Sequence, residues 1–345
     1  MKAFVTGSTG LLGSNLVRLL VEQGHEVKAL ARSAEKARRL LGDLNIEIVV
    51  GDMENLDGFV DAMTGCDVLF HTAAYFREYY QPGDHWKILE DINIKGTVRI
   101  LEAAEKRGVK KAIYVSSSGV IGRRADGKPG DETAAPPKLA EGNLYFKSKV
   151  LAEEAVYGFL KTHKLPVVMI LPGWMFGPSD AAPTSAGQLV LDYLDKKIPG
   201  IVDGGGTVAD ARDVAQGMIN AVERGRSGER YIIAGEYYNL ETIGKTVEKV
   251  SGVPAPTMRI PYRILLAYAW FVQTSARLRG VETLMTVEGI RTLHYQEKIS
   301  SEKAIRELGI TFRPLEETLR DEVNWFRARK TQTEQASTVR VVNRA

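Results

Sequence analysis

A glycine-rich segment near the N-terminus constrains the fold of this chain more than any other feature. It lies between an apolar run at 2–6 and an amphipathic segment at 11–23, and it reads Thr6-Gly7-Ser8-Thr9-Gly10-Leu11-Leu12-Gly13. Glycines here let the backbone turn tightly and approach a pyrophosphate, while the next helix presents unpaired N–H groups and a positive dipole end. A glycine-rich turn alone is common, but one between a first strand and a first helix predicts a dinucleotide site. We expect all eight residues to contact the cofactor.

Short β-branched runs alternate with helical segments through the first half of the chain. Strands are predicted at 2–6, 26–30, 46–50, 68–71, 111–116, 167–171 and 230–234. Helices are predicted at 11–23, 56–63, 86–107, 144–162 and 213–224. This alternation is typical of an α/β fold, here a doubly wound Rossmann parallel sheet with helices on both faces.

The pattern loosens after Pro172, where glycine and proline cluster at 172–183 and again at 199–206. We therefore expect a dinucleotide-binding Rossmann domain at 1–172, completed by about 204–235. A smaller, mainly helical substrate-binding region is expected at 173–203 and 236–330. Residues 331–345 are polar and without helical periodicity, so a disordered tail is predicted there.

Charge and cysteine content exclude several classes of protein. The 46 Lys and Arg residues nearly balance 43 Asp and Glu and are interspersed with them, which argues against a nucleic-acid partner. The single cysteine, Cys66, permits no intrachain disulfide, and no signal-peptide pattern precedes the glycine loop, so a cytoplasmic location is expected. No metal site is predicted.

One apolar stretch, at 264–272, is about half the length that a membrane span needs. Arg263 and Arg277 bracket it. No transmembrane span is predicted, and a buried or peripheral helix is expected, with weak association with a membrane surface as the other interpretation.

The residue after the second strand selects between the two nicotinamide dinucleotides. An acidic residue there accepts from the adenosine ribose of NAD, whereas an arginine pairs with the 2′-phosphate of NADP. This chain has Arg32, with Lys36, Arg38 and Arg39 close behind, which favours NADP(H) over NAD(H). The alternative is that Arg32 only begins an exposed helix. Asp52 and Met53, after the third strand, are expected at the cofactor, with Asp52 accepting from the adenine amino group.

Tyr145 and Lys149 are four residues apart on a predicted helix, so their side chains lie one above the other. A phenol titrates near pH ~10, and an adjacent ammonium lowers that value toward neutrality. The pair also occurs by chance in many helices. However, the serine run 116–118 closes the fifth strand, at the edge where open α/β sheets bind ligands and where a hydroxyl can polarise a carbonyl.

Taken together, these motifs resemble those of an extended short-chain dehydrogenase/reductase of the NAD-dependent epimerase/dehydratase superfamily. The resemblance covers roughly 1–235 and rests on six motifs: the glycine loop, His71-Thr72-Ala73-Ala74, Asn93-Ile94-Lys95-Gly96-Thr97, the serine run, the Tyr/Lys pair and Leu171-Pro172-Gly173-Trp174-Met175-Phe176-Gly177-Pro178.

The resemblance implies a role for each matching residue. Tyr145 is the acid/base, Lys149 lowers its pKa and binds the nicotinamide ribose, and Ser117 holds the reacting oxygen. Ser116 and Ser118 remain alternatives to Ser117. Asn93 is expected to be structural, with a water as one possible intermediary. The cofactor cleft is further expected to contain Thr72, Ala73, Ala74, Pro172, Gly173, Trp174 and Met175.

The substrate region differs from that of nucleotide-sugar enzymes in the same superfamily. Gly206 falls about where those enzymes have a diphosphate-binding arginine, and Arg212 cannot be assumed to replace it. Aromatic residues, which can wall a pocket for a bulky apolar substrate or simply join the core, follow the fourth strand: Tyr75, Phe76, Tyr79, Tyr80 and Trp86. We expect Tyr75, Phe76, Ser117 and Trp174 at the substrate. The missing arginine and the aromatic residues together resemble the pattern of the dihydroflavonol-4-reductase-like group and its hopanoid-associated relatives.

Three functions remain open from the sequence. The first is an NADP(H)-dependent reductase of a ketone or aldehyde, in which Tyr145 supplies the proton. The second is an epimerase or dehydratase that retains its cofactor, and the third is a non-catalytic dinucleotide sensor. A homodimer is expected, formed through the predicted helices at 86–107 and 144–162.

Overall fold

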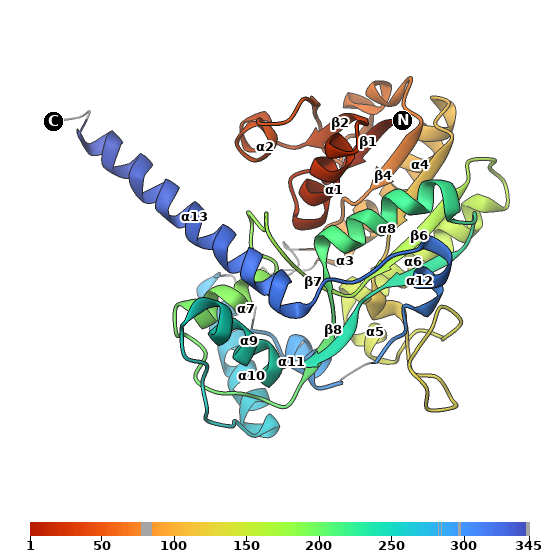
Figure 1. Ribbon diagram of the computed structural model, residues 1–345. Coiled ribbons are helices and arrows are strands. Elements are labelled where there is room, and N and C mark those ends of the chain that lie inside the picture. Colours follow the sequence, from red (N-terminus) through yellow and green to blue (C-terminus); the bar gives the residue numbers. More distant parts are fainter. Residues whose placement is uncertain (77–84, 282, 284, 296–297, 343–345) are drawn as a thin grey trace.

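Seven parallel strands form the central sheet of the protein, described here from a computed structural model (Figure 1). The structure describes residues 1–76, 85–281, 283, 285–295 and 298–342, with side chains described up to Thr331. The strands are β1 (Lys2–Thr6), β2 (Glu26–Ala31), β3 (Glu47–Val50), β4 (Val68–His71), β5 (Lys111–Val115), β6 (Val167–Pro172) and β9 (Arg230–Ile233). Their bounds lie within one residue of the predicted ones, and the predicted doubly wound fold is confirmed.

The strand order β3-β2-β1-β4-β5-β6-β9 places a reversal of chain direction across the sheet between β1 and β4. The last residues of these two strands, Thr6 and His71, are paired in register. In open α/β sheets a ligand crevice opens outside the carboxyl ends of the strands at such a reversal. The glycine loop follows Thr6 directly, so it lies at this crevice.

Helices cover both faces of the sheet because neighbouring strand residues point to opposite sides. In β1, Phe4 packs into one core cluster, and Ala3 and Val5 pack into the other. The Phe4 side is covered by α4 (Gly96–Lys106) and α6 (Leu144–Leu160), and the opposite side by α1 (Leu11–Glu22), α2 (Ala34–Leu41), α8 (Ala211–Arg224) and α12 (Glu302–Leu308).

The C-terminal region forms a second lobe below the main sheet in Figure 1. It contains α7 (Ser185–Leu194), α9 (Leu240–Ser251), α10 (Tyr262–Arg279), α11 (Val287–Tyr295) and the first turns of α13 (Leu315–Val342). A three-stranded sheet, which the sequence did not predict, joins the lobes in the order β10 (Glu236–Asn239), β8 (Gly205–Asp210) and β7 (Trp174–Phe176).

Three predicted segments differ in the structure. Residues 56–63 form two short 3-10 helices, η1 (Leu56–Gly58) and η2 (Val60–Met63), because glycine at position 58 interrupts the run. The helix predicted at 86–107 is divided into α3 (Trp86–Leu89), a π-helical segment η4 (Glu90–Lys95) and α4. Where a disordered tail is predicted, α13 runs on to Val342 through a segment without glycine or proline.

No helix within the described residues combines the length and hydropathy needed to cross a bilayer.

Candidate active site

The glycine loop is held in a conformation that leaves the N-terminus of α1 open. Gly7 has a φ of +66°, and a Cβ on it would lie 2.6 Å from Thr72 Oγ1, so only glycine fits. Gly10 caps α1 without a side-chain hydrogen bond, and the first turn of α1 has no acidic residue. The first N–H groups of α1 can therefore bind a pyrophosphate.

Two loop residues that we expected at the cofactor instead hold the loop in place. Ser8 is fully buried, and its hydroxyl donates to the carbonyl oxygen of Leu30 over 2.8 Å. Thr6 Oγ1 accepts from the backbone N–H of Ala73 at 3.1 Å. Neither residue lines the cavity that begins at the loop. The loop is thus tied to β2 and to the segment after β4.

A cavity of about 1300 Å³ runs from the glycine loop into the C-terminal lobe. All the other residues expected at the cofactor line it: Gly7, Thr9, Gly10, Leu11, Leu12, Gly13, Arg32, Asp52, Met53, Thr72, Ala73, Ala74, Tyr145, Lys149, Pro172, Gly173, Trp174 and Met175. Lys36, one turn into α2, also faces the cavity, whereas Arg38 and Arg39 do not line it. Two cations therefore border the part of the cavity next to the end of β2.

Tyr145 occupies the first turn of α6, close to the reversal point of the sheet. The carboxamide oxygen of Asn143 accepts from the N–H of Phe146 at 3.1 Å and so fixes the start of this helix. The ring of Phe76 packs on the Tyr145 ring with centroids 4.7 Å apart. The positive end of the α6 dipole favours a phenolate at this position.

Lys149 lies one turn further along α6, and only 2% of it is exposed. Its Nζ is 5.9 Å from the centroid of the Tyr145 ring and donates to the carbonyl oxygen of Val115 over 2.9 Å. Burial lowers the pKa of Lys149 from 10.5 to about 8, partly opposed by the carboxylate of Glu153. The lysine is therefore an ammonium at neutral pH, next to the phenol.

The three serines after β5 are placed differently. Ser116 is buried, and its hydroxyl donates to Glu153 Oε1 over 2.5 Å. Ser117 caps the 3-10 helix η5 (Ser118–Val120), with Oγ accepting from the N–H of Gly119 at 3.1 Å. A hydroxyl that accepts from a backbone N–H keeps its own proton for donation. Of these two, Ser117 is therefore the better donor to a substrate oxygen.

Glu153 is a buried residue that sequence reasoning missed. It follows Lys149 by one helical turn, and that spacing was the available signal. Burial raises its pKa, while Ser116 and Arg230 favour the carboxylate, Arg230 Nη1 lying 3.3 Å from Glu153 Oε2. Tyr145, Lys149 and Glu153 thus share one face of α6, and the last two are buried.

Asn93 is structural, as expected, but it acts directly. Its Oδ1 accepts from the N–H of Tyr75 at 2.7 Å, and its Nδ2 donates to the carbonyl oxygen of Tyr75 and to Ser148 Oγ. These bonds place the segment after β4 against α6. The π-helical turn η4 carries this side chain inward.

The substrate end of the cavity is largely apolar. It is lined by Ile198, Ile201, Val202, Ile260, Leu265, Met285, Ile290 and Leu293 from the C-terminal lobe, together with Tyr75, Phe76 and Trp174. The Tyr75 hydroxyl is 2.8 Å from His85 Nδ1. Two other aromatic residues named above, Tyr79 and Tyr80, lie outside the described residues.

The position expected to hold a diphosphate-binding arginine lies against an indole. A Cβ on Gly206 would be 3.7 Å from Cε3 of Trp174. Arg212 does not replace that arginine, because it does not line this cavity and pairs with Asp210 and Asp321 at 2.7 and 2.6 Å. Arg32 is the single arginine among the described lining residues.

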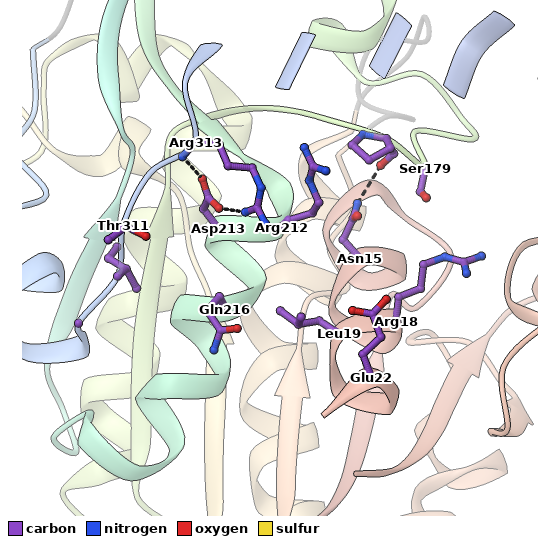
Figure 2. A pocket seen from close by; sticks show the side chains of 13 residues that line it. Asn15, Arg18, Leu19, Glu22, Ser179, Arg212, Asp213, Gln216, Thr311 and Arg313 are labelled. Carbon is purple, nitrogen blue, oxygen red and sulfur yellow. Dashed lines mark hydrogen bonds and ion pairs between the residues drawn. The ribbon is translucent and has the colours of Figure 1, made fainter. Parts of the chain in front are cut away.

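Arg212 instead lines a smaller cavity of about 430 Å³ between α1, α8 and residues 309–313. Figure 2 shows Arg313 bonded to Asp213 in this cavity. Asn15 donates to the carbonyl oxygen of Pro178 over 2.9 Å. Among the described residues, no cluster of His, Cys, Asp or Glu could hold a metal ion.

The sequence profile of the NAD dependent epimerase/dehydratase family matches residues 3–234. The chain belongs to this family. Its members of the extended short-chain dehydrogenase/reductase type are NAD(P)-dependent oxidoreductases and epimerases, and this chain is an enzyme of that type.

Relatives that match nearly the whole chain include a reductase and a sterol demethylase protein. The "Putative dihydroflavonol 4-reductase" of Synechocystis sp. is 33% identical over 94% of this chain and 94% of its own length. "Sterol demethylase protein B" of Methylococcus capsulatus is 30% identical over 95% of this chain and 99% of its own length. The crystal structure of gox2253 is 34% identical, with a TM-score of 0.80, over 95% of this chain and 98% of that one.

Proposed function

We propose that this protein reduces a carbonyl group of a bulky apolar or aromatic molecule, with NADPH as the hydride donor. The glycine at position 206, which brings no cation and where a Cβ would lie 3.7 Å from the Trp174 indole, carries this proposal. Where a nucleotide-sugar enzyme needs a cation for its diphosphate, this cavity has an apolar wall. An unpaired phosphate there would be desolvated without compensation.

The remaining lining supports the same class of substrate. On the substrate side of the cavity, the described lining contains one lysine, Lys197. Its Nζ pairs with Asp195 at 2.8 Å. Most other side chains of the C-terminal lobe in this lining are aliphatic or aromatic. The names of the relatives, a dihydroflavonol reductase and a sterol demethylase protein, are compatible with a multi-ring substrate.

The glycine loop fits a dinucleotide, because a Cβ at Gly7 would fill the space beside Thr72 and the N-terminus of α1 has no side-chain cap. NADPH bound in this cleft supplies the hydride. Arg32 and Lys36 would hold its 2′-phosphate, and Asp52 its adenine amino group.

Side chains of this protein carry out the proton transfer. Tyr145 Oη donates its proton to the substrate oxygen as that oxygen gains negative charge. The ammonium of Lys149 and the N-terminus of α6 stabilise the phenolate that remains. The Ser117 hydroxyl donates a hydrogen bond to the same oxygen, which favours the transition state over the ketone. Hydride and proton together convert the carbonyl to an alcohol.

Net cofactor consumption tests this proposal against the two rivals. The purified enzyme would be mixed with NADPH and either multi-ring ketones, dihydroflavonols or UDP-sugars. We expect alcohol to form from a ketone, mole for mole with the NADPH lost. Interconversion of UDP-sugar epimers without NADPH loss would contradict the proposal in favour of an epimerase. Binding of NADPH without turnover of any of these compounds would favour a sensor.

We also expect a cytoplasmic homodimer. The interface would be formed by α4 and α6, which lie side by side on the Phe4 face of the sheet. Light scattering of the purified protein tests this expectation, since a monomeric mass would contradict it.

A further inference from the structure

Helix α10 exposes a larger apolar surface than its core contacts require. Leu265 and Ala269 pack with Ile290 of α11 in a small cluster. In contrast, Trp270 is 63% exposed, Phe271 62% and Leu278 84%. Water-facing side chains of this size in one helix mark a surface that has a partner.

Three of the exposed apolar residues of α10 form a stripe along the helix. Ile264, Phe271 and Leu278 recur every seven residues, so they lie within a narrow sector of the helix. The stripe spans fourteen residues, or about 21 Å at 1.5 Å per residue. The buried positions, Leu265, Ala269 and Ala276, lie on the opposite side.

Positive charge flanks this stripe. Arg263, Arg277 and Arg279 lie near the two ends of α10, and α10 contains no Asp or Glu. Arg263, Trp270 and Arg277 themselves recur every seven residues, which places the indole between two guanidinium groups along one edge of the stripe. An apolar face with an aromatic ring and cations at its edge is typical of helices that lie in the interface of a bilayer.

The stripe is also continuous with the substrate cavity. Ile264 and Tyr268 are both exposed and line the cavity, and Leu265 lines it from the same helix. The apolar wall of the cavity therefore extends onto the outer surface of α10.

We propose that α10 docks the enzyme on a membrane surface that contains anionic lipids, with the helix parallel to the membrane and the cavity mouth at the lipid. The apolar stripe enters the boundary between headgroups and acyl chains, and the arginines bind lipid phosphates. A second copy of this protein is a less favourable partner for α10, because of the arginines on the helix. Two α10 helices packed antiparallel across a twofold axis would place Arg263 of each copy beside arginines of the other.

Vesicle sedimentation tests the proposal with the full chain and without substrate, so its result is independent of the proposed reaction. Vesicles of phosphatidylcholine alone are compared with vesicles that also contain phosphatidylglycerol. We expect the wild type to sediment with the anionic vesicles. The Trp270→Ser/Phe271→Ser variant should lose at least about tenfold in partition coefficient. Neither residue lines the cavity, so NADPH binding and the melting temperature should be retained.

Ile305→Ser on α12 is the matched control, because Ile305 is 47% exposed and lies on the main domain. It should sediment like the wild type. Arg277→Gln/Arg279→Gln should weaken binding to anionic vesicles roughly fivefold per arginine and leave binding to phosphatidylcholine unchanged.

Wild-type protein that stays in the supernatant with anionic vesicles would overturn the proposal. Equal sedimentation of the wild type and a folded Trp270→Ser/Phe271→Ser variant would also overturn it. A wild-type dimer that this variant converts to a monomer, without vesicle binding by either, would assign the stripe to a second copy.

Discussion

The ammonium of Lys149 donates a hydrogen bond to the carbonyl oxygen of Val115 over 2.9 Å. This bond crosses from α6 to the end of β5, directly before the serine run. It holds the buried charge beside Tyr145 at the edge of the sheet where the cofactor cleft opens. The bond therefore couples the positions of Lys149 and Tyr145 to the end of the strand that Ser117 follows.

This buried charge should reduce stability. The folded-state pKa of Lys149 is about 8, below the unfolded value of 10.5, so the folded protein binds fewer protons between these values. The free energy of unfolding therefore rises with pH across this window, and the full cost of the ammonium applies below it. Lys149→Met should stabilise the protein at neutral pH by on the order of 2 kcal/mol and abolish that rise.

Urea unfolding at about pH 7 and about pH 10 measures both effects of Lys149→Met. The variant should also lose most of its reductase activity. A variant less stable than the wild type at neutral pH would show that the buried ammonium contributes net stability.

Tyr145→Phe should lower kcat by about 10²- to 10⁴-fold, because the variant keeps the ring contact with Phe76 but has no proton to transfer. The Kd for NADPH should change little. Tyr157→Phe, an exposed position on the same helix, is the control and should leave kcat unchanged. Steady-state kinetics and fluorescence titration provide the two readouts, and near-normal turnover by Tyr145→Phe would exclude the assigned proton donor.

The adjacent serines should have separable roles. Ser117→Ala should lower kcat/KM about 100-fold, as loss of one donor to a developing oxyanion does. Ser116→Ala removes the hydrogen bond to Oε1 of the buried Glu153 and should destabilise the protein by about 1–3 kcal/mol, with a smaller effect on kcat. Steady-state kinetics and thermal unfolding of both variants test these roles. A larger loss of activity in Ser116→Ala and a larger loss of stability in Ser117→Ala would contradict them.

Arg32→Ala should raise KM for NADPH about tenfold or more and change KM for NADH little, since a charge-assisted hydrogen bond contributes about 1.5–3 kcal/mol. Arg38→Ala is the control, because Arg38 lies nearby on α2 but does not line the cavity. Equal increases for both cofactors would argue against a 2′-phosphate contact.

Strand positions and the proximity of Tyr145 to Lys149 could be predicted because they depend on local periodicity. The apolar runs that form β1 and β4 and the four-residue spacing of Tyr145 and Lys149 are visible without tertiary information. The contact of Gly206 with Trp174 could not be predicted, since it joins β8 and β7 in a sheet whose pairing depends on distant segments.

Local composition was misleading in two other places. The helix at 86–107 has a continuous helical pattern, yet the hydrogen bonds of Asn93 to Tyr75 and Ser148 accompany a π-helical turn there. The sequence after Thr331 appears polar and aperiodic, yet α13 continues through it. Helical periodicity of apolar residues in a sequence indicates that one face of the helix is buried. A helix that extends away from the rest of the protein buries no face, so its sequence needs no such periodicity.

Transfer of deuterium in a single turnover tests the central claim most directly. The enzyme would be mixed with a multi-ring ketone and NADPH deuterated at C4 of the nicotinamide, and the products analysed by mass spectrometry. The account predicts one deuterium on the new carbinol carbon, one equivalent of NADP⁺ released, and no such product from Tyr145→Phe. Deuterium retained on the cofactor while a UDP-sugar changes configuration at one carbon would contradict it.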